Sequence, residues 1–169
     1  MITDFLKWIW EKFERFILPF TIISVYERGV ILTFGKNPKL IPPGFIWKVP
    51  FIQEIFSETI TPNTLQAKCV HVTTVDGKTI SVSPAIEFII VDAIKWLIDT
   101  NDAATNLHDI LRAETADHIT DKTWDEVKKK TTRTEIKREV NKSALKMGAE
   151  ITRLMFTDIS QSRVIITQI

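Results

Sequence analysis

A stretch rich in proline, glycine and large apolar residues, 25–52, constrains the fold more than any other part of the sequence. It predicts two short apolar strands around a loop. Gly29 is expected to let the backbone turn into a strand over 30–34, and Gly35 with Pro38 is expected to end that strand.

The second half of this stretch is a stiff turn followed by aromatic residues. Pro42, Pro43 and Gly44 cannot continue a helix or join a central strand. Phe45 and Trp47 follow the turn directly. The stretch holds no nucleophile, base or set of ligands, so it predicts a shaped apolar surface rather than a catalytic centre.

Four short motifs in this stretch resemble, in order and spacing, the opening of the stomatin/prohibitin (SPFH or Band 7) domain. They are Glu27-x-Gly29-Val30, Phe34-Gly35-Lys36, Pro43-Gly44-Phe45 and Val49-Pro50-Phe51-Ile52. The turn positions that carry the likeness are Gly29, Gly35, Pro43, Gly44, Pro50 and Phe51. Later landmarks extend it to Asp158-Ile159. The resemblance implies an α+β domain with a mostly antiparallel sheet packed against helices, expected over 21–169.

The sequence departs from the family pattern at both ends. SPFH proteins usually begin with a membrane-spanning or hairpin segment and continue after the domain into a long charged coiled coil. Here a short amphipathic segment comes first, and the sequence ends about ten residues after Asp158-Ile159. We therefore expect the domain without the usual coiled coil, and we do not expect large cages.

Composition indicates an ordinary globular domain. The chain has 169 residues, 44% of them apolar and 25% charged, which argues against disorder. The net charge of +1 gives no case for nucleic acid. A single cysteine, Cys69, excludes an internal disulfide. Most of the five Trp and ten Phe lie in the first 56 residues, which points to a function for this end of the chain.

Residues 1–20 are predicted to form an amphipathic, membrane-associating helix that Pro19 stops. Its longest uncharged stretch, 16–26, would cover only about 16 Å as a helix, against roughly 30 Å of hydrocarbon. It is therefore expected to lie in the interface rather than span the bilayer. Packing of the helix on the domain's own core is the alternative. The expected membrane-binding residues are Phe5, Leu6, Ile9, Trp10, Phe13, Phe16, Ile17 and Phe20.

The segment 21–91 is predicted to be mostly β. Asp76-Gly77 is a two-residue hairpin signal between strands over 66–75 and 78–91, and apolar residues alternate in the second strand. Pro84 places a sheet edge or a bulge there. Cys69 and His71 should share one face of a strand, but no further ligands lie nearby, so an inert core thiol beside a partly buried imidazole is expected rather than a metal site.

From Asp92 the pattern becomes helical. One predicted helix has an apolar face that includes Glu114. Thr123 to Glu126 form a capping box, and a further helix ends at Gly148, before a final β segment from about 149 to 158. The apolar positions are Ala103, Ala104, Leu107, Ile110 and Leu111 on the first helix and Ile136, Val140, Ala144 and Met147 on the last.

No catalytic constellation is apparent. Glu114 and His118 lie four residues apart and could form an acid–base pair, but a structural hydrogen bond, or His118 at a solvated edge, is the simpler interpretation. No nucleophile is tied to them, and the chain has no glycine-rich phosphate loop. The chain is therefore predicted to be no enzyme and to hold neither cofactor nor metal.

Charge is segregated in the helical region. Residues 92–126 carry nine acids and three bases, whereas 128–146 carry eight bases and two acids. The two faces can pair within one molecule or join copies head to tail, which closes into a ring or runs on as a filament. The residues expected at such an oligomer contact are Asp109, Asp117, Asp121, Lys137, Arg138 and Lys142.

These features together predict a non-catalytic, membrane-associated scaffold that faces the cytoplasm and self-associates. The family resemblance implies that it organises a membrane patch or regulates a membrane protein such as a protease or channel. The alternative is a soluble interaction module whose aromatic N-terminal segment binds a protein partner.

Overall fold

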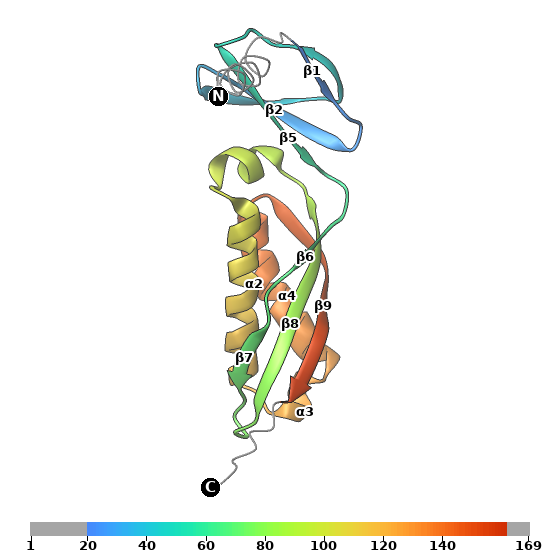
Figure 1. Cartoon of the computed structure of the whole chain (residues 1–169), viewed down its shortest axis with the longest axis vertical. Coiled ribbons are helices and arrows are strands. Elements are labelled where there is room, and N and C mark those ends of the chain that lie inside the picture. The colour runs from blue at the N-terminus through green and yellow to red at the C-terminus, as the bar shows by residue number, and fades with distance from the viewer. Residues whose placement is uncertain (1–19, 162–169) are drawn as a thin grey trace, which may run out of the picture. The chain divides into compact units, whose positions relative to one another are not determined.

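The computed structural model describes residues 20–161 (Figure 1). The chain divides into two compact units, 1–61 and 62–169, and the boundary falls inside the segment predicted as one domain. Within the described residues, the N-terminal unit consists of β-strands, and the C-terminal unit combines strands with helices. The strands pair antiparallel in both units. The predicted N-terminal helix lies outside the described residues, apart from Phe20.

The described part of the N-terminal unit consists of five strands. β2 (Glu27–Thr33) lies between β3 (Lys36–Ile41) and β5 (Gln53–Thr59) in an antiparallel sheet. β1 (Phe20–Ile23) and β4 (Gly44–Trp47) form a separate two-stranded ribbon. Among the described residues of this unit, only Ile23 and Val30 are fully buried apolar side chains, so its core is small.

Two expectations for this unit are wrong in detail. The segment predicted as a loop after Gly35 contains the edge strand β3, and Pro38 lies within it, where an irregular register opposite Ile31 and Thr33 tolerates a residue without an N–H. Gly29 makes no turn: it lies inside β2, and a Cβ there would come within 2.2 Å of Ile23 Cδ1. Close packing, not backbone freedom, requires this glycine.

The C-terminal unit is a four-stranded antiparallel sheet built on one long strand. β8 (Thr79–Ile90) pairs along one edge with β9 (Ala149–Gln161) and along the other with β6 (Asn63–Gln66) and β7 (Val70–Thr73). The short turn η1 (Lys95–Asp99) and the helices α2 (Ala103–Thr120), α3 (Trp124–Val127) and α4 (Lys130–Lys146) connect β8 to β9. α2 contacts β7 and α4 contacts β9, so the helices cover one face of the sheet (Figure 1).

Pro84 lies in this central strand, and the predicted bulge is confirmed there. The register of β8 with β9 shifts between Ser83 and Pro84, and on the other edge β6 ends and β7 begins opposite this point. The proline therefore removes no ladder donor that a neighbouring strand needs. Thr157, the extra residue on β9, donates its hydroxyl to Ser83 O at 3.0 Å and restores one hydrogen bond.

The hairpin at Asp76-Gly77 exists but has a longer loop than predicted. β7 ends at Thr73, and Thr74 N donates to Lys78 O at 3.0 Å, so three residues form the loop. The Asp76 carboxylate accepts hydrogen bonds from the Thr74 hydroxyl and, at 3.3 Å, from the N–H of Trp124 at the start of α3. These bonds and the 2.9 Å ion pair with Lys78 lower the pKa of Asp76 to about 2, with the Thr74 hydroxyl the largest contribution.

The helical part agrees with the predicted pattern in its main residues. Leu107 and Leu111 are fully buried, with Thr115 and Ile119 continuing the stripe at every fourth position, whereas Ala104 is exposed and Ile110 and Glu114 are half-buried. Thr123 and Glu126 form the capping box, with Thr123 N donating to Glu126 Oε2 at 3.0 Å. The stripe on α4 is buried as predicted, and Gly148 follows the helix at φ +85°.

Candidate functional site: an exposed apolar surface on the N-terminal unit

One face of the β1–β4 ribbon carries four large apolar side chains. Phe20 pairs with Trp47 and Ile22 pairs with Phe45 in an antiparallel register, which places all four on the same side. The rings of Phe20 and Phe45 stack with their centroids 5.4 Å apart. These side chains nevertheless remain between 40% and 70% exposed. We refer to Phe20, Ile22, Phe45 and Trp47 as the ribbon face.

The opposite side of the ribbon attaches it to the rest of the unit. Ile23 is buried, and Thr21 and Ile46 are half-buried. Ile23 Cδ1 lies so close to the Gly29 backbone that a methyl group there would overlap it. The ribbon is therefore fixed by one side and displays the other, which is the reverse of the usual burial of aromatic residues.

Two further phenylalanines are held in an unfavourable backbone conformation close to one another. Phe34 has φ +53° and Phe51 has φ +66°, although bulky residues rarely adopt positive φ. The N–H of Phe34 donates to Ile52 O at 2.7 Å, which brings the Phe34-Gly35 and Pro50-Phe51 motifs together. Both side chains are mostly exposed. Strain of this kind persists where the surrounding structure fixes it and is concentrated at functional sites.

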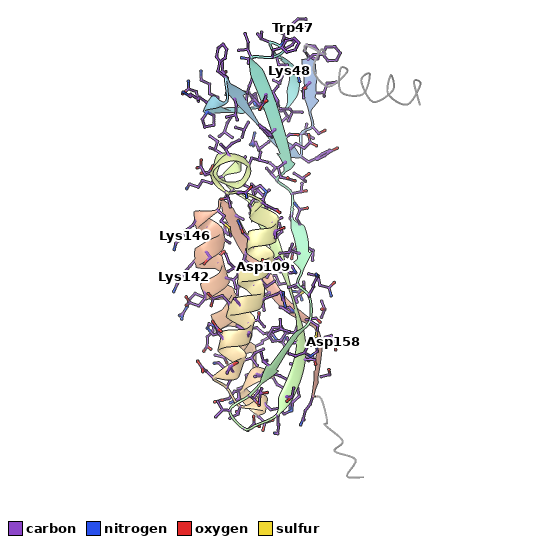
Figure 2. The ribbon with its side chains drawn as sticks, turned by 60° about the vertical axis from the view of Figure 1, so that its left-hand side comes forward. Trp47, Lys48, Asp109, Lys142, Lys146 and Asp158 are labelled. Carbon is purple, nitrogen blue, oxygen red and sulfur yellow. The ribbon has the colours of Figure 1, made fainter. Side chains whose placement is uncertain are left out.

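Exposed apolar side chains are concentrated on this unit. The described part of the C-terminal unit exposes three large apolar residues, Val75, Val91 and Leu145. The described part of the N-terminal unit, which is much smaller, exposes Phe20, Ile22, Val25, Tyr26, Phe34, Leu40, Phe45, Trp47, Val49, Phe51 and Phe56. Contiguous exposed apolar patches are typical of surfaces that bind lipid or protein partners. Lys48 follows Trp47 on the same unit (Figure 2), and Trp with Lys is a common pair at membrane interfaces.

A groove on the same unit adds shape to this surface. It has a volume of about 560 Å³, and its lining includes Thr21, Lys48, Phe51 and Phe56. Gln53 Oε1, in the lining, accepts a 2.9 Å hydrogen bond from the N–H of Val49. The lining is mixed: Thr21, Lys48, Gln53 and Glu54 lie beside Pro50, Phe51, Ile55 and Phe56. The groove therefore offers both apolar contacts and hydrogen-bonding groups to a bound segment.

Several predicted site residues lie outside the described part of the chain. Of the eight expected membrane-binding residues, the structure describes Phe20, which lies on the ribbon face. Among the turn residues, Gly35 and Gly44 have positive φ, as their positions in turns require. The remaining membrane-binding predictions concern Phe5, Leu6, Ile9, Trp10, Phe13, Phe16 and Ile17.

The structure also adds residues that the sequence interpretation missed. Ile22 was not singled out, and the pairing of Phe20 with Trp47 and of Ile22 with Phe45 was not foreseen. The available signal was the alternation Phe20-x-Ile22 and Phe45-x-Trp47, which puts each pair on one side of its strand.

The six expected oligomer-contact residues lie on α2, α4 and the turn between α2 and α3. Asp109, Asp117 and Asp121 are exposed, and Asp109 Oδ1 lies 3.0 Å from His108 Nδ1. Arg138 and Lys142 both pair with Glu139 of their own helix, at 3.2 and 2.7 Å. Lys137 donates to the carbonyl oxygen of Thr152 at 2.8 Å. Figure 2 shows Asp109 on α2 and Lys142 on α4.

The histidines and the cysteine lie in simple structural surroundings. His118 Nδ1 is 3.0 Å from Glu114 O, the hydrogen bond expected between them, and 3.8 Å from Glu114 Oε2. His71 Nδ1 bonds Ser81 Oγ at 2.7 Å. Cys69 is exposed rather than in the core, which corrects the expectation of a buried thiol. Over 20–161, no cluster of three or more His, Cys, Asp or Glu side chains could hold a metal ion.

None of the described helices combines the length and apolar character needed to cross a membrane.

Comparison with known proteins gives one family and two curated relatives. The model of the SPFH domain / Band 7 family matches residues 21–169, and so covers both units. The chain is 30% identical over 111 residues to Protein HflK of Vibrio cholerae and 30% identical over 97 residues to Protein HflK of Vibrio parahaemolyticus. These alignments cover 63% and 57% of this chain but only 28% and 23% of the relatives, so the chain spans about a quarter of their length. The chain belongs to the SPFH domain / Band 7 family.

Proposed function

We propose that this chain is a non-catalytic scaffold of the stomatin/prohibitin type, attached to a membrane surface through the ribbon face and residues 1–19. The ribbon face carries the proposal, because four large apolar side chains on one side of a ribbon remain exposed to water. Family membership supports it. A surface that the fold fixes but does not cover needs a partner, and a lipid interface accepts aromatic and aliphatic side chains without specific shape.

The expected strength of attachment is moderate. Fully burying one such side chain contributes about 1.5–3 kcal/mol, and these four are already partly covered. Together they supply on the order of 5 kcal/mol before ordering costs, to which an interfacial helix over 1–19 would add. This corresponds to reversible binding at the surface.

On the membrane, the chain would organise a lipid patch or regulate a membrane protein such as a protease or channel. The likeness to Protein HflK supports a role of this kind at the level of the family. Self-association and a cytoplasmic orientation belong to the same proposal. The segregated charges of α2 and α4 offer surfaces for contacts between copies.

Flotation with phosphatidylcholine vesicles tests the membrane step. The double variant Ile22→Glu/Trp47→Glu places two charges on the ribbon face and should weaken flotation strongly while keeping its circular dichroism spectrum. Val75→Glu/Leu145→Glu is the matched control, because it changes two exposed apolar residues of the other unit and should float like the wild type. Salt should have little effect, because the attachment is apolar.

The same measurement distinguishes membrane attachment from the main alternative, a soluble interaction module. A wild-type chain that stays with the soluble fraction at all lipid concentrations would contradict membrane attachment. The ribbon face would then belong to a soluble interaction module that binds a protein partner. Equal flotation of the ribbon variant and the wild type would place the attachment elsewhere in the chain.

A further inference from the structure

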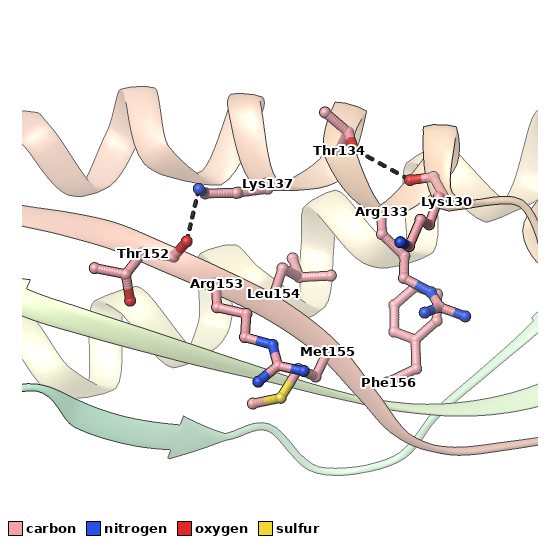
Figure 3. Close-up of a pocket in the computed structure, with 9 residues that line it drawn as sticks. All are labelled: Lys130, Arg133, Thr134, Lys137, Thr152, Arg153, Leu154, Met155 and Phe156. Carbon is pink, nitrogen blue, oxygen red and sulfur yellow. Dashed lines mark hydrogen bonds between the residues drawn. The ribbon is translucent and has the colours of Figure 1, made fainter.

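A groove between α4 and β9 has a strongly basic lining. Its volume is about 470 Å³, and it lies on the C-terminal unit, separate from the ribbon face. Lys130, Arg133 and Lys137 come from α4 and Arg153 comes from β9 (Figure 3). The remaining lining residues are threonines and the apolar residues of β9, so no carboxylate lines the groove.

These cations are not neutralised by neighbours. Neither Lys130 nor Arg153 forms an ion pair within residues 20–161. Glu87 lies across the β8–β9 ladder from Arg153, but no ion pair joins them in the described structure. Lys137 is held by a carbonyl oxygen, which positions its ammonium group without cancelling its charge. The groove therefore keeps an excess of positive charge.

Several basic residues lie at the N-terminal end of α4, where positive charge is unfavourable. α4 begins after Lys129 and its first turn holds no acidic residue, while Lys128, Lys129 and Lys130 follow one another. The N-terminal end of a helix carries a partial positive charge and free N–H groups, so cations there reduce helix stability and anions increase it. Lys128 is compensated by its 3.1 Å ion pair with Asp125 and by its contact with the Trp124 ring. Lys130 has no ion pair among the described residues, so this cation breaks the local rule without compensation and points to a functional requirement.

Arg133 contributes a further cation to the groove, and its guanidinium group has no ion pair among the described residues. Its Nε atom is buried and has no hydrogen-bond partner among the described residues. Its guanidinium group lies over the ring of Phe156 at 5.4 Å, which fixes its plane beside the groove (Figure 3). Because Nε itself is buried, a ligand in the groove would accept from the two terminal nitrogens of this guanidinium group.

We propose that this groove binds a phosphate-bearing ligand, either a soluble phosphate compound or the phosphorylated headgroup of a lipid. A phosphate group carries up to two negative charges and several acceptor oxygens, which four cations and a helix N-terminus can match. Arginine binds such oxygens in a bidentate manner. The lining of α4 from Lys130 to Lys137 spans only about 10 Å, enough for one or two phosphate groups and too short for a long acidic segment.

Titration calorimetry of the full chain with inorganic pyrophosphate tests the site directly. We expect saturable binding in the millimolar range or tighter, and weakening at higher salt. Lys130→Gln/Arg153→Gln should weaken it at least about tenfold, because two charge-assisted contacts are lost. Arg138→Gln/Lys142→Gln is the matched control, because it also removes two positive charges. Both lie on α4 outside the groove, so the affinity should change less than about twofold.

Arg133→Lys separates directed binding from net charge. It keeps the positive charge but removes the planar fork, so pyrophosphate binding should weaken while the melting temperature stays close to that of the wild type. The proposal is overturned by an absence of saturable binding, or by equal weakening in the groove variant and its matched control.

Vesicles distinguish the two sources of phosphate. In the Ile22→Glu/Trp47→Glu background, which weakens the proposed apolar attachment, flotation is measured with phosphatidylcholine alone and with added phosphatidylinositol bisphosphate. Flotation that needs the phosphorylated lipid and is lost on adding Lys130→Gln/Arg153→Gln identifies a headgroup. Pyrophosphate binding without such flotation identifies a soluble compound. If pyrophosphate does not bind but the groove variant loses cross-linked oligomers, the groove holds another copy and the proposal fails.

Discussion

The N–H of Phe34 donates a 2.7 Å hydrogen bond to the carbonyl oxygen of Ile52, and this bond connects two turns that each hold a phenylalanine at positive φ. Phe34 directly precedes Gly35, and Phe51 directly precedes Ile52. Neither turn is strained in order to bury its aromatic ring, because both side chains are mostly exposed. The strain is instead consistent with a requirement for aromatic groups at this surface.

Replacing Phe34 with glycine should separate stability from binding. Glycine adopts φ +53° without strain, so Phe34→Gly should raise the free energy of unfolding, or at least not lower it, with a gain of up to about 1 kcal/mol. Vesicle flotation should weaken. Phe45→Gly is the control, since it removes a similarly exposed ring from strand β4 and should cost about 0.5–1 kcal/mol. A large loss of stability in Phe34→Gly would show that the ring packs in solution.

The contact of Gly29 with Ile23 gives a second prediction. Gly29→Ala would put a methyl carbon 2.2 Å from Ile23 Cδ1 and 2.6 Å from Ile41 Cγ1, and this overpacking should cost about 1–3 kcal/mol. Ile23→Val deletes Cδ1 and should recover part of the loss in the double variant, although it is destabilising alone. Urea denaturation of the four proteins measures the coupling. Additive effects would mean that the two residues do not meet as described.

Local rules predicted the turns and caps of the C-terminal unit well. The Asp76-Gly77 hairpin, the bulge at Pro84, the capping box at Thr123 and the helix end at Gly148 each depend on residues close in sequence. Turn and cap preferences are short-range effects, so a single sequence shows them directly. The predicted hairpin loop is one residue shorter than the observed loop, because the ends of strands depend on pairing as well as on the turn.

Long-range pairing was less accessible from the sequence. β1 pairs with β4 across the whole of β2 and β3, and this register, rather than any local motif, puts Phe20 beside Trp47. The role of Gly29 depends on Ile23 and Ile41, which approach it only after folding. The basic groove was missed for the same reason, because Arg153 lies on a different strand from the lysines of α4.

Acid should weaken the connection between the β7–β8 loop and α3. The pKa of Asp76 is lowered from 3.8 to about 2, so its carboxylate stabilises the folded state fully above pH 3.8 and progressively less as the pH falls toward 2. Asp76→Asn should remove this part of the pH dependence, and it should lower stability at neutral pH. Melting temperatures of both proteins between pH 6 and pH 2 measure it. Parallel curves would contradict a lowered pKa.

Charge reversal tests whether copies meet through the helices of the C-terminal unit. In the described structure no ion pair joins the expected acidic residues to the expected basic residues: Arg138 and Lys142 pair with Glu139. The ion pairs Asp125–Lys128 and Lys122–Glu135 join the two charged stretches. The six expected contact residues make no ion pair with one another and remain available to a neighbouring copy. Each exposed pair contributes only about 0–1 kcal/mol, so association should depend on the high local concentration at a membrane.

Two reversed variants and their mixture are needed to test this contact. The basic variant changes Lys137, Arg138 and Lys142 to glutamate, and the acidic variant changes Asp109, Asp117 and Asp121 to lysine. Each alone should float with vesicles but give no cross-linked oligomers, and the mixture should restore cross-linking between the two types. Cross-linking of the groove variant Lys130→Gln/Arg153→Gln, measured in parallel, shows whether the groove side of α4 also contributes to the contact between copies. Oligomers that ignore every reversal would exclude charge complementarity, because repulsion between like-charged faces should have prevented them.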